Sequence, residues 1–188
     1  MPGRWGPDGP PEEAYSRVTD PERFAPVVAA VDRIVAELAA TYDVKVETLT
    51  NDDLVALRLP GIASAPVLRA VRVVPRAGAP LTLGVSDFPG VRVWRGTWEG
   101  GGGFPVCGCD ACDEDADDCI ELLEGFVAET VAGAFTERLT RHRLFSTHRH
   151  GSGWQLLDRD EYRALKALGR PGRRTWVAWP RRADSLWA

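Results

Sequence analysis

Three valine-rich segments lie close together in the middle of the chain, at Val67 to Val74, Leu81 to Ser86 and Val91 to Trp98. The proline- and glycine-containing turns that separate them, Pro75 to Pro80 and Asp87 to Gly90, are short. Parallel strands need a crossover of a dozen or more residues, whereas antiparallel strands need only a tight turn. The sequence therefore predicts an antiparallel meander at the centre of the fold.

Helical periodicity flanks this meander on both sides. Asp20-Pro21 is a typical helix start, and apolar residues then recur at helical spacing from Phe24 to Leu38, which predicts a helix ending near Tyr42. From about Asp115 the period returns, and its apolar stripe continues as far as Leu139. This pattern predicts a long second helix packed on the sheet.

The remaining segments complete an α+β fold class: a mainly antiparallel sheet with an N-terminal helix, a long helix after a cysteine loop, and a C-terminal β-β-α-β segment. Strands are also predicted at Val44 to Glu47 and Leu54 to Leu59, whereas Gly100 to Gly103 breaks the strand pattern. The C-terminal segment is predicted as strands around Leu144-Phe145 and Trp154 to Leu157, a helix of about ten residues that begins after Asp158 and stops at Gly169, and a strand from Arg173 to Trp179.

The domain organisation follows from composition. Residues 1–19 are rich in proline and glycine and are predicted to be a flexible N-terminal arm. Residues 20–182 are predicted to be a single α+β domain with a cysteine loop at 104–119, and residues 183–188 a tail. A chain of 188 residues with 44% hydrophobic residues can build a core without disulfides or metals. A cysteine cluster in such a chain needs its own explanation.

All four cysteines, Cys107, Cys109, Cys112 and Cys119, fall within 13 residues. Four thiols at such short spacing are a typical ligand set for tetrahedral zinc. Gly108 allows the bend that brings Cys107 and Cys109 to the same side, and Cys119 is predicted in the first turn of the following helix. The sequence therefore predicts a structural zinc site on these four cysteines.

The negative charge of a four-cysteine zinc site leaves the identity of the fourth ligand open. Four thiolates around Zn²⁺ carry a net charge of about −2, and the neighbouring carboxylates add to it. Replacement of one cysteine by a histidine would lower this negative charge. His148, His150 and the carboxylate of Asp113 are therefore alternative ligands.

Two other interpretations of the cysteines compete with zinc: thiols that bind nothing, and a redox pair. An acidic setting disfavours a reactive low-pKa thiolate, and a disulfide needs an oxidising compartment. A zinc deaminase is excluded because the chain has no H-x-E motif upstream of the cysteines.

The stretch F-P-V-C-G-C-D-A-C-D-E, Phe104 to Glu114, resembles the hallmark of an uncharacterised bacterial family, a domain of unknown function. The strands before it and the helix after it look similar as well. The resemblance carries over Cys107, Cys109 and Cys112 as motif cysteines, with Cys119 outside the motif. It implies family membership and no activity.

The net charge of −4 hides two opposite blocks. Residues 99–137 contain 11 acidic and no basic residues, and residues 138–182 contain 12 basic and three acidic residues. The simpler interpretation is that the two blocks face each other or water. A protein partner could instead use the acidic 110–124 surface or the basic 138–182 surface. Nucleic acid is disfavoured by the overall acidity and by the absence of a known binding motif.

No secretory signal or membrane-spanning stretch is visible, which predicts a cytoplasmic protein without a membrane contact. These observations favour a non-enzymatic binding or regulatory protein with a structural zinc-binding cysteine loop. The alternative is an enzyme, either a thiol redox protein or a metal-dependent hydrolase that uses the cysteine loop and the nearby histidines.

Overall fold

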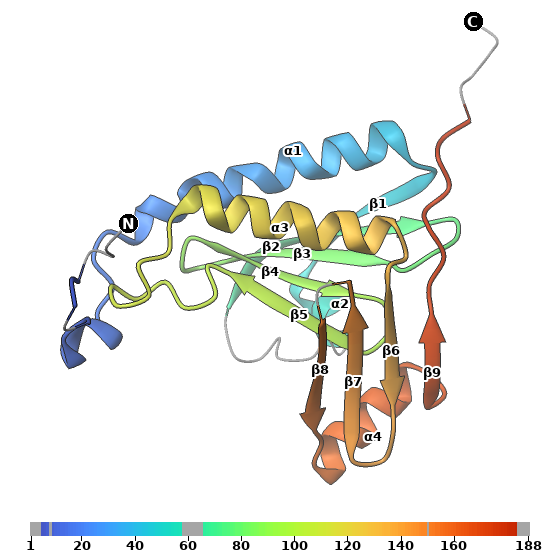
Figure 1. The fold of residues 1–188 in the computed structure, drawn as a ribbon. Helices are drawn as coiled ribbons and strands as arrows, with labels where there is room; N and C mark the ends of the chain where they lie inside the picture. Colours follow the sequence, from blue (N-terminus) through green and yellow to red (C-terminus); the bar gives the residue numbers. More distant parts are fainter. Residues whose placement is uncertain (1–4, 8, 58–65, 150, 184–188) are drawn as a thin grey trace, which may run out of the picture.

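The computed structural model describes residues 5–7, 9–57, 66–149 and 151–183 (Figure 1). These residues form two antiparallel sheets, one of five strands in the order β1-β2-β3-β4-β5 and one of four strands in the order β8-β7-β6-β9. Helices pack on both sheets, so the predicted α+β fold class is confirmed.

The first sheet is a plain meander in which every neighbouring pair is antiparallel. Its strands are β1 (Val44–Leu49), β2 (Val67–Pro75), β3 (Leu81–Ser86), β4 (Gly90–Arg95) and β5 (Glu99–Phe104). Two long helices, α1 (Ala25–Thr41) and α3 (Ala116–Val131), lie side by side over it (Figure 1). The N-terminal helix is confirmed, although Pro21–Phe24 forms a 3-10 turn, η2, ahead of it.

The second sheet contains β6 (Phe135–Leu139), β7 (Arg143–His148), β8 (Gly151–Leu156) and β9 (Gly172–Thr175). The helix α4 (Arg159–Leu168) covers one of its faces, and Leu165 of α4 contributes to a small apolar cluster with Leu139, Leu144, Leu157 and Trp98. The predicted β-β-α-β segment is confirmed, including the capping box in which Asp158 and Glu161 satisfy each other's backbone amides.

The segment after β9 returns to the first sheet, and Trp179 anchors it there. The Trp179 indole is 4% exposed, donates a hydrogen bond to Ala79 O at 2.9 Å and meets the Tyr42 ring edge-on. The Trp179 backbone amide donates to Val131 O at 2.8 Å. Trp179 is therefore part of the core between the first sheet and its two helices.

The predicted strand at Leu54 to Leu59 is wrong, because residues 51–56 form a short helix, α2 (Asn51–Ala56); residues 58 and 59 lie outside the described residues. Thr50 and Asp53 explain the difference. The Asp53 backbone amide donates to Thr50 Oγ1 at 3.2 Å, and the Asp53 carboxylate accepts from Thr50 N at 2.8 Å. This reciprocal capping satisfies donors that open a helix, and it outweighs the β propensity of the residues that follow.

The predicted break at Gly100 to Gly103 is also wrong, because these glycines belong to β5. β5 pairs with β4, with Val91 opposite Phe104 and Arg95 opposite Glu99. The hydrogen bonds between neighbouring strands are made by backbone groups. A strand composed largely of glycine can therefore still pair with its neighbour.

The apolar stripe from Asp115 to Leu139 does not form one helix, since α3 ends at Val131 and Phe135 begins β6. Gly133 makes this change of direction with φ +63°, a left-handed conformation that favours glycine. The predicted strand at Arg173 to Trp179 is likewise shorter, because β9 ends at Thr175.

Replacing Gly133 by alanine is expected to lower the free energy of unfolding by about 2 kcal/mol or more. A Cβ at this position would lie 2.5 Å from the Val177 carbonyl carbon and 2.8 Å from Trp176 O, in addition to the unfavourable φ. Gly125, within α3, is the matched control because its Cβ would meet nothing within 4 Å. Gly125→Ala should stabilise the protein by about 0.5–1 kcal/mol. Urea unfolding of both variants measures the difference, and equal effects would contradict it.

Within the described residues, no helix combines the length and the apolar character needed to cross a membrane.

Candidate metal centre

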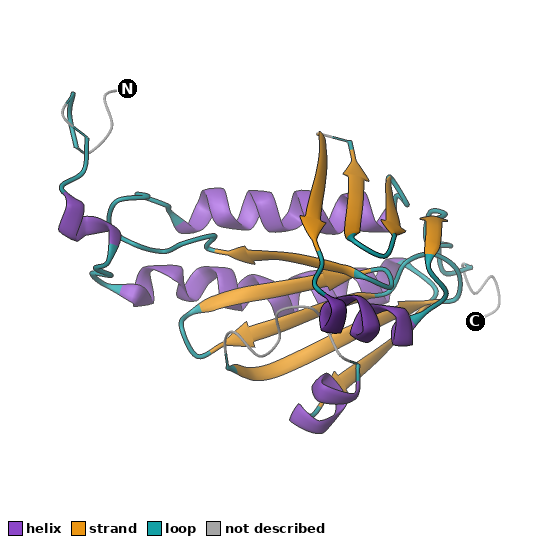
Figure 2. Ribbon diagram, turned by 90° about the horizontal axis from the view of Figure 1, so that it is seen from below, coloured by secondary structure: helices purple, strands orange, loops and turns teal. Residues whose placement is uncertain are grey.

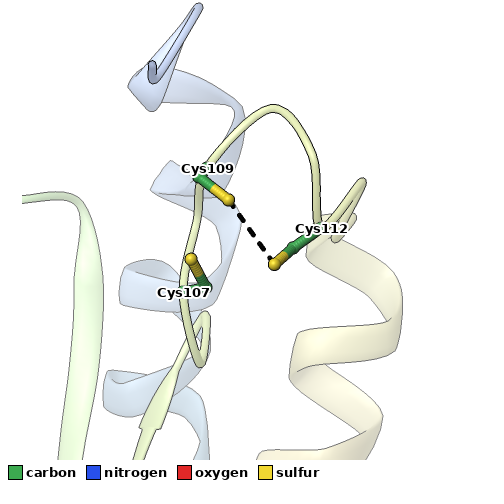
Figure 3. Close-up of side chains that lie close together, drawn as sticks. All are labelled: Cys107, Cys109 and Cys112. Atoms are coloured by element: carbon green, nitrogen blue, oxygen red, sulfur yellow. Dashed lines mark hydrogen bonds between the residues drawn. The ribbon is translucent and has the colours of Figure 1, made fainter. Parts of the chain in front are cut away.

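Three of the four cysteines meet in the loop between β5 and α3. The Sγ atoms of Cys107, Cys109 and Cys112 all lie within 4.8 Å of one another, as Figure 3 shows. The Cys109 and Cys112 sulfurs are 3.5 Å apart. Cys109 is 4% exposed, whereas Cys107 and Cys112 are exposed. The cluster therefore has one buried sulfur and two that are open to solvent.

The bend at Gly108 makes this convergence possible, as the sequence predicts. Gly108 has φ +77°, and a Cβ there would lie 2.8 Å from the Phe88 ring. The backbone closes a second turn through a hydrogen bond from Cys112 N to Cys109 O at 3.3 Å. Two consecutive turns thus replace an extended strand that would point the sulfurs apart.

Glu114 holds the first half of the loop. Its carboxylate accepts hydrogen bonds from the backbone amides of Val106, Cys107 and Gly108 at 2.8, 2.9 and 2.8 Å. Burial raises the pKa of Glu114, but these three donors outweigh burial and keep the pKa below its ordinary value. The carboxylate is therefore a structural acceptor for the loop as well as a negative charge near the sulfurs.

Asp110 connects the loop to the N-terminal segment. Its side chain is fully buried and accepts from Thr19 N at 2.7 Å, from Thr19 Oγ1 at 2.8 Å and from Arg17 Nε at 2.8 Å. Hydrogen bonds from Thr19 and Arg17 hold the pKa of Asp110 well below its usual range. In return, the backbone amides of Asp110 and Ala111 donate to Arg17 O and Ala14 O. Residues 14–19 and the cysteine loop therefore brace each other.

The three sulfurs differ in acidity. Hydrogen bonding from the Cys107 side chain and from the Cys112 backbone amide lowers the pKa of Cys109. Hydrogen bonding to the side chains of Cys109 and Cys107 raises the pKa of Cys112 to about 12. Sulfurs this close do not all ionise easily at neutral pH unless a cation lies among them.

The other predicted ligands lie elsewhere or outside the described residues. Cys119 is not among the clustered sulfurs: it lies on the core-facing side of α3 and is 2% exposed, and burial and the charges of nearby carboxylates raise its pKa to about 11. His148 is in β7, with Nδ1 4.0 Å from a Glu129 carboxylate oxygen. Asp113 follows Cys112 in a left-handed conformation and is not part of the cluster. His150 lies outside the described residues.

Sequence reasoning missed the two carboxylates that shape the loop. From the sequence, Asp110 and Glu114 are only negative charges near the sulfurs. In the structure Glu114 accepts three backbone amides, and Asp110 accepts one backbone amide and two side-chain donors. The only signal for Glu114 was its place two residues beyond the C-x-x-C pair. The hydrogen-bond partners of the Asp110 carboxylate are more than 90 residues away, and no local pattern relates them.

The comparisons with known proteins identify a family and no individual relative. Neither the curated proteins nor the solved structures contain a match to this chain. A family model described as a family of unknown function, DUF6226, matches residues 2–183. Because this match covers nearly the whole sequence, the chain belongs to the family of unknown function DUF6226.

Proposed function

We propose that this protein is a cytoplasmic, non-enzymatic binding or regulatory protein whose cysteine loop is held by a structural zinc ion. The observation that carries the proposal is the convergence of three Sγ atoms within 4.8 Å. Sulfurs bound to one tetrahedral zinc at 2.3 Å lie about 3.8 Å apart. The Cys109–Cys112 separation of 3.5 Å is close to that value, so a small adjustment of the loop suffices.

The chemistry of the cluster selects the kind of metal. Thiolates are soft ligands that favour zinc, copper(I) and iron–sulfur clusters over magnesium or calcium. Zinc is the metal most often held by a knuckle such as Cys109–Cys112. Thiolate ligands stay reduced in a reducing compartment, so the proposed zinc site and the proposed cytoplasmic location are consistent with each other.

The surroundings of the loop support a structural role. Glu114 and Asp110 already fix both halves of the loop, and Asp110 adds residues 14–19. An ion at the sulfurs would add a cross-link where the two halves of the loop and residues 14–19 meet. A site of this kind stabilises local structure and requires no reacting substrate.

A thiol redox protein is the second candidate, and the Cys109–Cys112 pair favours it. Their sulfurs are 3.5 Å apart in a C-x-x-C arrangement, and the pKa of Cys109 is lowered while that of Cys112 is raised. An asymmetric pair is typical of thiol–disulfide exchange. A metal-dependent hydrolase receives less support, because His148 lies beside Glu129 and not in the cysteine cluster.

Metal content and native thiol counting together separate these candidates. For protein purified without added chelator, we expect about one zinc per chain and slow reaction of all four thiols with Ellman's reagent. A chelator should release the zinc and expose Cys107, Cys109 and Cys112, while Cys119 stays slow because it is buried. Metal-free protein with one fast-reacting thiol would contradict the zinc proposal and favour redox chemistry.

A further inference from the structure

The second sheet has one face covered by α4 and an opposite face turned toward solvent. In Figure 1 the helix lies behind the strands, and Figure 2 shows it to one side of them. Leu139 and Leu144 point to α4, where they are 2% and 6% exposed. Because side chains alternate along a strand, their neighbours Arg138 and Phe145 lie on the free face.

The strand register places side chains of similar chemistry in the same row across this face. One row across the four strands contains Trp154 opposite Phe145, Phe145 opposite Arg138, and Arg138 opposite Arg173. The row beside it contains only hydroxyl side chains, and on the other side Arg143 lies opposite Leu156. We call this face the platform; it consists of Arg138, Arg143, Phe145, Trp154, Leu156 and Arg173 with the hydroxyl row Thr136, Thr147, Ser152 and Thr175.

The two aromatic rings of the platform differ in exposure, and Phe145 is half-buried. Trp154 is 60% exposed and Leu156 is 62% exposed. The Arg143 guanidinium lies 4.9 Å from the centre of the Trp154 ring, and that of Arg138 lies 5.9 Å from the centre of the Phe145 ring. Each ring thus has a cation beside it on the same exposed surface.

Charge on the platform has one sign. Strands β6 to β9 contain a single acidic residue, Glu137. Glu137 points to the covered face, is fully buried and accepts hydrogen bonds from the Thr97 and Trp98 amides. The platform itself therefore presents three arginines without a carboxylate among its strand residues.

We propose that the platform binds single-stranded nucleic acid, with bases stacked on the two aromatic rings and phosphates held by the three arginines. Adjacent strands are about 4.8 Å apart, so aromatic residues opposite each other can receive neighbouring bases of one strand. Arginine and hydroxyl donors alongside the rings suit the sugar–phosphate chain. An acidic peptide would use the arginines but leave the paired rings and the hydroxyl row without a role.

This proposal differs from the expectation based on overall charge. The net charge of −4 disfavours nucleic acid for the chain as a whole, but 11 of the acidic residues lie in segment 99–137. The platform carries the opposite charge because its charged residues, Arg138, Arg143 and Arg173, come from the basic segment. Binding depends on the local field at the contact surface as well as on net charge.

Fluorescence anisotropy with a labelled 12-residue oligothymidylate at 50 mM salt tests the proposal. Trp154→Ala should weaken binding roughly 5- to 140-fold, the equivalent of one lost stacking contact. Arg138→Ala and Arg173→Ala should each weaken binding and reduce the slope of log affinity against log salt by about 0.7. Both kinds of variant change exposed residues, and circular dichroism checks that they fold.

Two control variants match these substitutions in charge and exposure. Arg163→Ala removes an exposed arginine from α4, and Leu68→Ala removes an exposed apolar residue from β2; both should bind like the unchanged protein. An abasic oligonucleotide should bind more weakly than oligothymidylate, since it cannot stack. No binding, equal binding of the abasic or duplex form, or preferential binding of polyglutamate would overturn the proposal, the last result indicating an acidic protein partner.

Discussion

Cys109→Ser is expected to weaken zinc binding by more than about 100-fold. Groups that only orient a metal's ligands already contribute 10- to 100-fold in affinity, and Cys109 would be a ligand itself. It is also the least exposed sulfur of the cluster and the one whose pKa is lowered, so it is the sulfur best prepared to meet a cation. Competition titration with a chromophoric chelator gives the affinity of the variant and of the unchanged protein.

Cys119→Ala is the matched control for this experiment. Cys119 faces the apolar core from α3, apart from the clustered sulfurs, so its removal should leave the zinc affinity unchanged. Hydrogen exchange supplies an independent readout, since chelation should speed exchange in residues 104–119 and leave β2 and β3 unaffected. A loss of affinity in Cys119→Ala as large as that in Cys109→Ser would contradict the three-cysteine site.

Glu137→Ala is expected to lower the free energy of unfolding by about 2–4 kcal/mol. The Glu137 carboxylate is fully buried and accepts from Thr97 N at 2.8 Å and from Trp98 N at 2.7 Å. Alanine would leave both amides without this acceptor at the junction between β4, β5 and β6. Urea denaturation followed by tryptophan fluorescence measures the change.

Two further variants test whether the lost hydrogen bonds cause this decrease in the free energy of unfolding. Glu121→Ala removes an exposed carboxylate from α3 and should change stability by less than about 0.5 kcal/mol. Glu137→Gln keeps one acceptor oxygen and should fall between the alanine variant and the unchanged protein. If Glu137→Ala were as mild as Glu121→Ala, the buried carboxylate would not be joining the two sheets.

Much of the fold could be predicted because it depends on local sequence. Short turns between valine-rich segments are enough to predict an antiparallel meander, and Asp158 with Glu161 is enough to predict the start of α4. Features that depend on distant partners could not be predicted in this way. β5 consists largely of glycine and exists because β4 offers it a backbone ladder.

The end of α3 is a second feature that local sequence did not predict. The apolar period continues through Phe135 and Leu139, but these residues are buried as part of β6, opposite His148 and Leu144. A stripe of apolar residues reports burial and does not distinguish a helix from a helix followed by a strand. Gly133 is the local signal for the end of the helix. That this position requires glycine becomes visible only in the structure, where the Val177 backbone approaches it closely.

For the candidate site, the spacing of the cysteines predicted four ligands, and the structure brings the sulfurs of three of them together. Cys119 did not join them because its place in the first turns of α3 directs it into the core. The anchoring of the loop by Arg17 and Thr19 was out of reach, since these residues lie more than 90 positions before Asp110.

Trp179 has a consequence for the order of events during synthesis. A nascent chain that has emerged as far as Val131 contains every strand of the first sheet and both helices that cover it. Its core still lacks the Trp179 indole, which lies between Tyr42 and Ala79 in the finished molecule. The core of the part made first is thus completed last, and until residue 179 emerges from the ribosome its unfilled apolar surface is available to chaperones.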